Sequence, residues 1–262
     1  MKQKINFRKV NTIAFLTILK NEADRFLRIW QQTLLPSAIT MTLYFLIFGS
    51  FIGKRIGIVE NVSYMQFIAP GLIMMAVITN SYANVVSSFY SIRFQHSVEE
   101  LLVAPVPNWI IVIGFSCGGV MRGLINAILV TAIALLFTDI QVHHIFITIS
   151  IVLLTSILFS LAGFTNALFA RRFDDVAIIP TFVLTPLTYL GGVFYSLQQL
   201  PEFWKIVSHF NPILYMVNAF RYGILGISDV PIFGAMIIII FATVALFSLN
   251  MYLLKRGVGI RT

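Results

Sequence analysis

Long apolar stretches dominate the pattern of hydrophobic and polar positions along the chain. Each stretch has about the 20 residues that an α-helix needs to cross the hydrocarbon core of a bilayer. None contains Asp, Glu or Lys, and all ten acidic residues fall in the gaps between them. The pattern therefore predicts six transmembrane helices, over residues 33–51, 64–86, 109–137, 145–170, 177–195 and 231–254.

The segment before the first apolar stretch has a helical pattern of a different kind. Within residues 1–32, Leu19 and Phe26 recur at helical spacing, whereas Lys20 and Arg28 share another face. A basic face opposite apolar side chains is typical of a helix that lies in the membrane interface. We therefore expect an interfacial helix here, with an ordinary amphipathic helix packed on protein as the alternative.

The gap before the last apolar stretch, residues 196–230, is rich in Phe, Trp and Tyr but too polar for a simple span. Aromatic rings prefer the membrane–water interface. Gly191, Gly192 and Pro201 interrupt the helical pattern on the approach to it. The sequence thus predicts short helices at the outer interface, with a re-entrant or broken segment.

Composition supports a membrane protein. The apolar fraction is 58% and the charged fraction only 11%, whereas soluble domains have about 25% charged residues. With the N-terminus inside, 13 of the 18 Lys and Arg residues fall on the cytoplasmic side, as the positive-inside rule requires. We expect an all-α polytopic membrane protein of one domain, residues 1–262, with both termini cytoplasmic.

The net charge of +8 raises the question of nucleic acid, but the cations sit at the chain ends and in short loops. That distribution suits anionic lipid headgroups better than a nucleic-acid-binding surface. The single cysteine, Cys117, excludes an intrachain disulfide and a multi-cysteine metal site.

Motifs for enzymatic chemistry are weak. Gly49 to Arg55 resembles a nucleotide-binding loop, but it has three residues between its glycines and Arg in place of the Mg²⁺-binding hydroxyl. The adjacent pair Asp174 and Asp175 follows two arginines and could hold a metal ion in a membrane enzyme. A compact salt-bridged loop is the alternative, since such sites need several converging carboxylates.

Polar side chains inside the predicted spans are more informative. Arg122 stands near the middle of the third span, where a charge is costly and usually functional. It could bind backbone carbonyls, reach towards the interface, or face a polar cavity that attracts anionic groups. Asn80 and Asn84 lie on one stripe of the second span, a pattern that serves either helix packing or a transport pathway.

The third span also carries two small-residue spacings, Gly114/Gly118 and Gly119/Gly123. Such spacings allow two helices to approach closely. They predict close packing inside the subunit or, alternatively, contact with a second subunit.

The cytoplasmic loop 88–108 has a short amphipathic pattern. Phe94, Leu101 and Leu102 share a helical face, and Pro105 ends the helix. An exposed helix with acidic and apolar groups could dock into the groove of a partner. A helix packed under its own bundle is the alternative.

Three strings of the sequence carry a family resemblance: EELLVAPVP at 99–107, LTPLTYLGGVFYSLQQLPEFW at 184–204, and NPILYMVNAFRYGILG at 211–226. With them, the chain resembles the permease subunits of ABC-2 type transporters along essentially its whole length. The resemblance implies a multi-pass protein of the bacterial inner (cytoplasmic) membrane that exports a lipid-linked, glycolipid or amphiphilic substrate.

The resemblance also implies partners and site residues. Two copies would pair as a homodimer among membrane lipids, above separate ABC ATPase subunits that bind ATP and Mg²⁺, so this chain itself would bind no cofactor. The residues that would contact the ATPase are Glu99, Glu100, Leu101, Leu102 and Pro105. The outer re-entrant region would be built by Gly191, Gly192, Pro201, Asn211, Pro212, Tyr215 and Arg221.

A secondary transporter, which needs no ATP, is a third class. It would usually show paired halves or carboxylates within the spans for ion coupling. The sequence shows neither feature.

Overall fold

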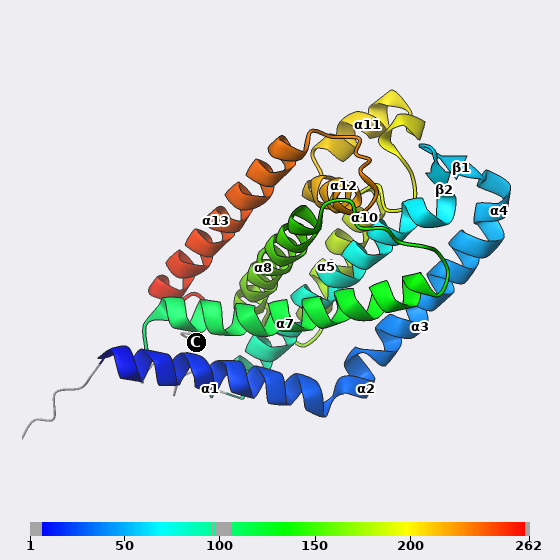
Figure 1. Ribbon diagram of the computed structural model, residues 1–262. Helices are drawn as coiled ribbons and strands as arrows, with labels where there is room; N and C mark the ends of the chain where they lie inside the picture. The colour runs from blue at the N-terminus through cyan, green and yellow to red at the C-terminus, as the bar shows by residue number, and fades with distance from the viewer. Residues whose placement is uncertain (1–6, 96, 98–105, 260–262) are drawn as a thin grey trace, which may run out of the picture.

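The computed structural model describes residues 7–95, 97 and 106–259, and these residues form a helical bundle (Figure 1). Within them, five helical segments are long and apolar enough to cross a membrane. They are Trp30–Ile56, Tyr64–Phe94, Asn108–Leu135, Ile145–Phe169 and Ile232–Arg256. The chain is therefore an all-α polytopic membrane protein.

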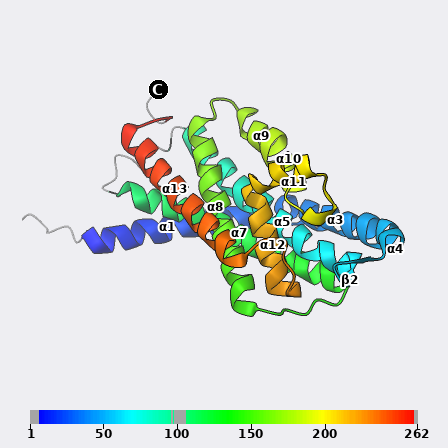
Figure 2. The same cartoon turned by 90° about the horizontal axis from the view of Figure 1, so that it is seen from above.

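The N-terminal helix α1 (Phe7–Arg28) lies beside the first half of α7 (Asn108–Leu135) (Figure 1). Seen from above, it extends from one side of the bundle, opposite the first candidate span (Figure 2). Phe26 is buried, while Lys20 and Arg28 are exposed. The segment is helical and part of it packs on protein, while its place in the membrane interface stays a prediction.

The first candidate span is a chain of short helices. It consists of α2 (Trp30–Thr33), α3 (Leu35–Tyr44), the π-helical η1 (Phe45–Ile52) and α4 (Gly53–Ile56). Pro36 stands in the first turn of α3, where its missing N–H removes no helical hydrogen bond. A two-stranded hairpin, β1 (Ile58–Val59) and β2 (Val62–Ser63), follows.

Helix α5 (Tyr64–Phe94) forms the centre of the bundle and packs against α7, α8 (Ile145–Phe169) and α12 (Pro212–Leu225). Ser63 and Gln66 form a capping box at its start, which satisfies the first free N–H groups. Its most apolar window is 78% buried, against 17% for the first candidate span and 11% for the last. The first and last spans therefore face lipid or another chain.

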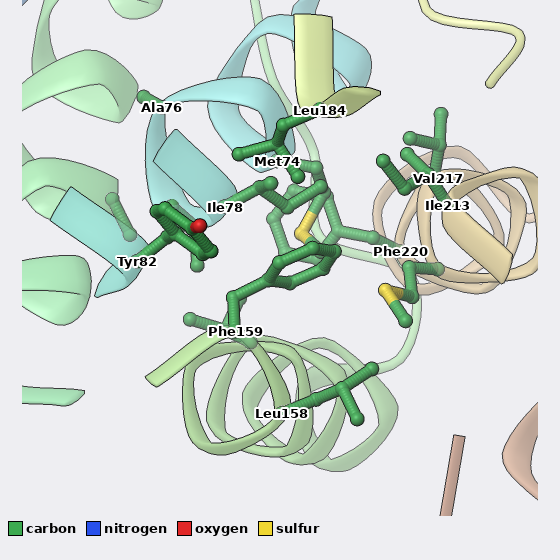
Figure 3. Close-up of a cluster of buried hydrophobic side chains, with 14 of the residues drawn as sticks. Met74, Ala76, Ile78, Tyr82, Leu158, Phe159, Leu184, Ile213, Val217 and Phe220 are labelled. Carbon is green, nitrogen blue, oxygen red and sulfur yellow. The ribbon is translucent and has the colours of Figure 1, made fainter. Parts of the chain in front are cut away.

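Buried side chains from four parts of the chain form the core beside α5 (Figure 3). Met74 of α5, Phe159 of α8 and Val217 of α12 meet there, and Leu184 closes the cluster from the segment before α12. Such close contact of large apolar side chains stabilises a bundle through dispersion, also where lipid is the solvent.

The predicted fifth span is a shorter, interrupted helix. It comprises α9 (Asp175–Ile179), the π-helical η2 (Pro180–Leu184) and α10 (Thr185–Tyr189). Pro180 and Pro186 lack the N–H groups that a regular helix needs, which explains the irregular middle. Over 15 residues it rises about 22 Å, less than the roughly 30 Å hydrocarbon core.

Its flanking residues nevertheless lie at opposite ends of α5. The Phe173 ring contacts the rings of Tyr90 and Phe94 at the C-terminal end. The Phe194 carbonyl accepts a hydrogen bond from the Tyr64 hydroxyl, 3.0 Å away, at the N-terminal end. Residues 173–194 therefore run along the length of α5.

Short helices precede the last span. They are η3 (Leu197–Gln199), α11 (Glu202–His209) and α12, and α13 (Ile232–Arg256) follows as the last helix among the described residues. Gly226 ends α12 in the left-handed conformation (φ 74°), which glycine adopts without strain. The aromatic-rich gap thus forms short helices, as predicted.

One boundary differs clearly from the sequence prediction. The second helix was expected to end at residue 86, but α5 continues to Phe94. Ser88 and Phe89 are buried there against α1 and the neighbouring helices. Hydropathy marks only the membrane-crossing part of a helix, so it could not show that the helix continues into the polar segment.

Candidate functional site

A buried carboxylate joins α1 to α5. Glu22 is 3% exposed, and its Oε2 lies 3.1 Å from Arg25 Nη2 and 3.0 Å from Asn84 Nδ2. Its other oxygen accepts a hydrogen bond from Ser88. Arg25 Nη2 also donates to Asn84 Oδ1 at 3.0 Å. These four residues, the Glu22 cluster, form a closed polar network, which is the condition for burying a charge at low cost.

The glycine spacings of α7 pack inside the subunit. A Cβ atom at Gly114 would lie 2.8 Å from Ile18 Cγ2, and one at Gly118 would lie 2.8 Å from Glu22 Cβ. Gly119 faces Ser160 of α8 and Val85 of α5 in the same way. Of the two alternatives, close packing within the subunit is therefore the one seen.

Arg122 lies on α7, about one helical turn beyond Gly118, which packs against Glu22. Its Nη2 donates to Asn80 Oδ1 at 3.2 Å, and its Nε is buried without a hydrogen-bond partner among the described residues. Asn80 donates in turn to Ser37 Oγ, 3.4 Å away on α3. Arg122 thus faces a cavity of about 270 Å³ between α2, α3, α5 and α7, lined by both polar and apolar side chains.

The polar stripe of the second span therefore has two roles. Asn84 belongs to the Glu22 cluster and holds α1, while Asn80 points towards Arg122 and the first span. Ser81 lies between them and faces Gly123 of α7. The stripe combines helix packing with the lining of a cavity.

At the other end of α5, Arg221 of α12 is 1% exposed. Its Nη2 donates to the Gly192 carbonyl at 2.6 Å and its Nε to the Phe67 carbonyl at 3.3 Å. Its guanidinium carbon lies 3.9 Å from the centre of the Phe67 ring. Arg221, predicted for the outer re-entrant region, is thus a buried residue that joins three segments of the chain.

Other residues predicted for the outer region have local structural roles. Asn211 caps α12 through Ile213 N and donates to the Leu187 carbonyl at 2.6 Å, and Pro212 occupies the first turn. The Tyr215 hydroxyl donates to the His209 carbonyl. Pro201 precedes the first turn of α11, and Gly191 packs against Ile213.

A second polar group at this end was not predicted. Ser196 Oγ lies 2.8 Å from Asp229 Oδ1 and also donates to Glu60. Asp229 Oδ2 accepts from the Leu197 backbone N–H at 3.0 Å. Burial raises the pKa of the Glu60 carboxyl, and the charge of Asp229 raises it further, although the Ser196 hydrogen bond and the Arg221 charge oppose the shift.

Glu60 also has an unusual backbone. It and Asn61 form the two-residue turn between β1 and β2 with φ values of 48° and 67°. A positive φ is uncommon for Glu and is retained only where the surroundings hold it. The contact with Ser196 supplies such a restraint, so the hairpin is docked onto the segment before α11.

Asp174 and Asp175, the acidic pair considered for a membrane enzyme, have different surroundings. Asp175 Oδ2 accepts from the Arg172 and Arg171 backbone N–H groups at 2.9 and 2.8 Å, and these bonds lower the pKa of its carboxyl. Asp174 is exposed. A compact loop is the structure seen, but backbone amides take the place of the expected side-chain salt bridges.

The predicted ATPase contact, Glu99, Glu100, Leu101, Leu102 and Pro105, lies outside the described residues. The helix that leads to it is firmly held. Arg93, in the last turn of α5, donates to the Leu168 carbonyl at 2.8 Å and to that of Ala167 at the end of α8. Arg93 therefore ties the end of α5, which lies next to the Glu22 cluster, to the end of α8.

A comparison with known families accounts for this architecture. The family described as ABC-2 type transporter matches residues 13–225. The chain therefore belongs to the ABC-2 type transporter family, and it is a multi-pass inner-membrane transport permease.

Relatives extend the match. The inner membrane transport permease YadH of Escherichia coli (strain K12) is 57% identical over 254 residues, covering 95% of this chain and 98% of that protein. Nodulation protein J of Rhizobium leguminosarum bv. viciae is 23% identical over 202 residues, covering 75% and 78%. Nodulation protein J of Rhizobium meliloti (strain 1021) is 24% identical, covering 75% and 77%.

Sequence reasoning missed the Glu22 cluster and the Glu60–Ser196–Asp229 group. In the sequence, a Glu that will be buried cannot be told from one that will be exposed. The carboxylates of Glu22, Glu60 and Asp229 all lie in polar gaps between the apolar stretches. The one signal available was position: Glu22 is one turn from Ile18 and Phe26, on the apolar face of its helix.

Proposed function

We propose that this chain is the membrane-spanning subunit of an ATP-driven exporter. The main support for this proposal is the family match, together with a relative named a transport permease that is 57% identical over 95% of this chain. Because the sequence lacks a nucleotide-binding loop, the energy would come from a separate ATPase subunit that binds ATP and Mg²⁺. The cargo would be a lipid-linked, glycolipid or other amphiphilic molecule.

The proposed topology has six crossings with both termini in the cytoplasm. The path of residues 173–194 along α5 supports a crossing by the interrupted helix. The excess of Lys and Arg on the inner side supports the orientation. Helices α11 and α12 would then belong to a re-entrant outer region.

In the proposed mechanism, closure of the ATPase pair pushes on loop 88–108 of each of two permease copies. The push would reach α5, whose last turn is tied to α8 by Arg93 and whose preceding turns are tied to α1 by Glu22. Because α5 is the most buried of the five candidate spans, its displacement would shift its neighbours together. The second copy would cover part of the exposed first or last span.

Crosslinking tests the proposed coupling. Single cysteines are placed in turn at each position of 94–105, with Cys117 replaced by Ala, and reacted with cysteines on the proposed ATPase subunit. We expect crosslinks at Glu99 or Glu100. A cysteine at Lys54, at the other end of the first span, is the matched negative control, and failure at every position of the loop would overturn the assignment.

Reconstitution tests the energy source. Permease and ATPase in proteoliposomes should show transport of a fluorescent amphiphile that stops when the ATP site of the ATPase is disabled. Asp174→Asn and Asp175→Asn should leave ATP-dependent transport in place, apart from any loss of stability at Asp175. Transport that continues without the ATPase would identify a secondary transporter instead.

A further inference from the structure

Arg122 is a partly buried cation without a carboxylate partner among the described residues. It makes one described hydrogen bond, to Asn80, and its Nε has no hydrogen-bond partner among the described residues. Within the described residues, the ion pair with an N–O distance of 4.0 Å or less is that of Arg25 and Glu22. No carboxylate of the described residues therefore lies that close to Arg122. A guanidinium has five N–H donors, and leaving them unmatched inside a membrane is costly.

The cavity that Arg122 faces is suited to an anion. Hydroxyl and amide groups line it, from Thr33 and Ser37 on one wall to Thr79 and Asn80 on the other. No Asp or Glu is among the lining residues. Arg25 lies near enough to add a second positive charge, although Glu22 partly offsets it. Thr33 and Thr79 donate their hydroxyl protons to backbone carbonyls, and Asn80 donates to Ser37 and Ala76. Among these wall residues, the Ser37 hydroxyl is therefore left, with Arg122, as a donor for a ligand. An arginine beside a hydroxyl donor is chemistry that recognises carboxylate and phosphate groups.

Size and position indicate which part of a ligand would enter. The cavity holds about 270 Å³, less than the roughly 300–1,000 Å³ of pockets that enclose a whole drug-sized molecule. One wall belongs to the first candidate span, of which only 17% is buried. A headgroup therefore fits inside, while an apolar tail would lie along the exposed face of that span.

We propose that this cavity binds the negatively charged headgroup of an amphiphile, with Arg122 as its charge partner, Ser37 as a hydrogen-bond donor, and Asn80 positioning the Arg122 guanidinium. The binding proposal does not depend on transport. That the bound amphiphile is the transported substrate rests on the proposed exporter function, and this assignment would narrow the substrates to anionic amphiphiles.

Native mass spectrometry of the protein in uncharged detergent tests the binding. Phosphatidylglycerol and phosphatidylcholine are added at equal concentrations, and the lipid-bound species are compared. The wild-type protein should prefer phosphatidylglycerol, and Arg122→Gln should weaken that binding about tenfold or more, as the loss of a charged hydrogen-bond partner predicts. Arg55→Gln, the same charge change at an exposed residue, should not alter it.

A second variant separates loss of the site from loss of the fold. Asn80→Asp keeps the side-chain volume and gives Arg122 an internal carboxylate, so it should reduce phosphatidylglycerol binding while the melting temperature holds or rises. Undiminished binding in Arg122→Gln or Asn80→Asp, or equal binding of phosphatidylcholine by the wild type, would overturn the proposal.

Inorganic phosphate identifies the source of the anion. If phosphate alone stabilises the wild type but not Arg122→Gln, the site accepts a free oxyanion; if only phosphatidylglycerol does so, the tail is required. Both results support an anion site. Wild-type binding without ATP-dependent transport of any anionic amphiphile would instead refute the exporter function and leave the site in place.

Discussion

At the scale of single residues, Glu22 is a buried group that joins α1 to α5. It is 3% exposed on a helix whose neighbouring Asp24 is exposed, and it accepts hydrogen bonds from Arg25, Asn84 and Ser88. Removing this acceptor leaves the buried Asn84 amide and Ser88 hydroxyl without it, whereas Arg25 keeps its bonds to Asn84 and Ser87. Glu22 and Arg25 therefore hold α1 against α5 together.

Glu22→Ala is accordingly expected to lower the free energy of unfolding by about 1–3 kcal/mol. Thermal unfolding in detergent measures it as a fall in melting temperature of roughly 2–4 °C per kcal/mol. Asp24→Ala removes the same charge from the exposed side of the same helix and should change the melting temperature little. Equal effects of the two variants would contradict the role given to Glu22.

At the scale of elements, the approach of α1 to α7 requires a glycine. A Cβ atom at Gly118 would meet Glu22 Cβ, Cγ and Oε2 at 2.8 Å, which forces the helices apart. We expect Gly118→Ala to lower the free energy of unfolding by about 1–3 kcal/mol, the usual cost of overpacking. Melting temperature is the measurement, together with faster tryptic cleavage after the exposed Lys20 if α1 detaches.

Gly234→Ala is the matched control for this change. Gly234 also lies within a long helix, but its Cβ would meet only Pro231 Cγ, at 3.8 Å. Since Ala favours the helix over Gly by roughly 0.5–1 kcal/mol, this variant should be neutral or slightly more stable. A loss of stability in Gly234→Ala as large as in Gly118→Ala would refute the steric argument.

The hairpin β1–β2 is docked by a titratable contact. Burial raises the pKa of Glu60 above its ordinary value of 4.5, and the charged groups that face it are Asp229 and Arg221. The folded chain therefore holds this proton to a higher pH than the unfolded chain. The free energy of unfolding should then fall as pH rises from about 4.5 through the raised pKa, and level off above it.

Glu60→Gln removes the titrating group and should flatten this part of the pH profile. Melting temperatures between about pH 4.5 and 7.5 measure the slope over the window in which the shift acts. Glu202→Gln, at an exposed position of α11, removes one carboxylate without touching the hairpin and should keep the wild-type profile. A wild-type slope in Glu60→Gln would show that another group is responsible.

How well the sequence predicts these elements depends on whether each one follows from its own residues or from contacts with distant residues. The long helices follow from apolar length alone, because the bilayer imposes it, and four predicted spans match helices to within a few residues apart from the extension of α5. The interrupted helix and the docked hairpin depend on contacts between distant residues, such as Ser196 with Glu60. Hydropathy has no information on such contacts, so they appear only in the fold.

The candidate site divides in the same way. Arg122 and Asn80 could be singled out because a charge or an amide within an apolar stretch is conspicuous. Glu22 and Ser37 could not, since they lie in or near polar segments and matter only through the helix that packs on them. The cavity requires four separate helices to meet, which no local pattern encodes.

At the scale of the whole molecule, the described residues divide into two ends. One end holds α1, and the other holds the hairpin, α11 and α12 (Figure 1). Contacts of Arg93 with Leu168 and of Phe173 with Tyr90 place the Arg171–Asp175 loop at the C-terminal end of α5. Five candidate spans alone would place the two termini on opposite sides of the membrane. If the interrupted helix also crosses, the number of crossings is six and both termini lie on the same side. Whether Asp175–Tyr189 crosses therefore decides the side on which α13 ends.

Cysteine accessibility tests this crossing. Asp174→Cys and Gln199→Cys, both at exposed positions flanking it, are made with Cys117 replaced by Ala and reacted with a membrane-impermeant maleimide. In intact cells whose outer membrane is permeabilised, we expect Gln199→Cys to react and Asp174→Cys to react only after lysis. Lys20→Cys and Ile58→Cys, exposed on α1 and on the hairpin, mark the inner and outer sides. If both flanking cysteines react from one side, the interrupted helix does not cross, the chain has five crossings, and the two termini lie on opposite sides of the membrane.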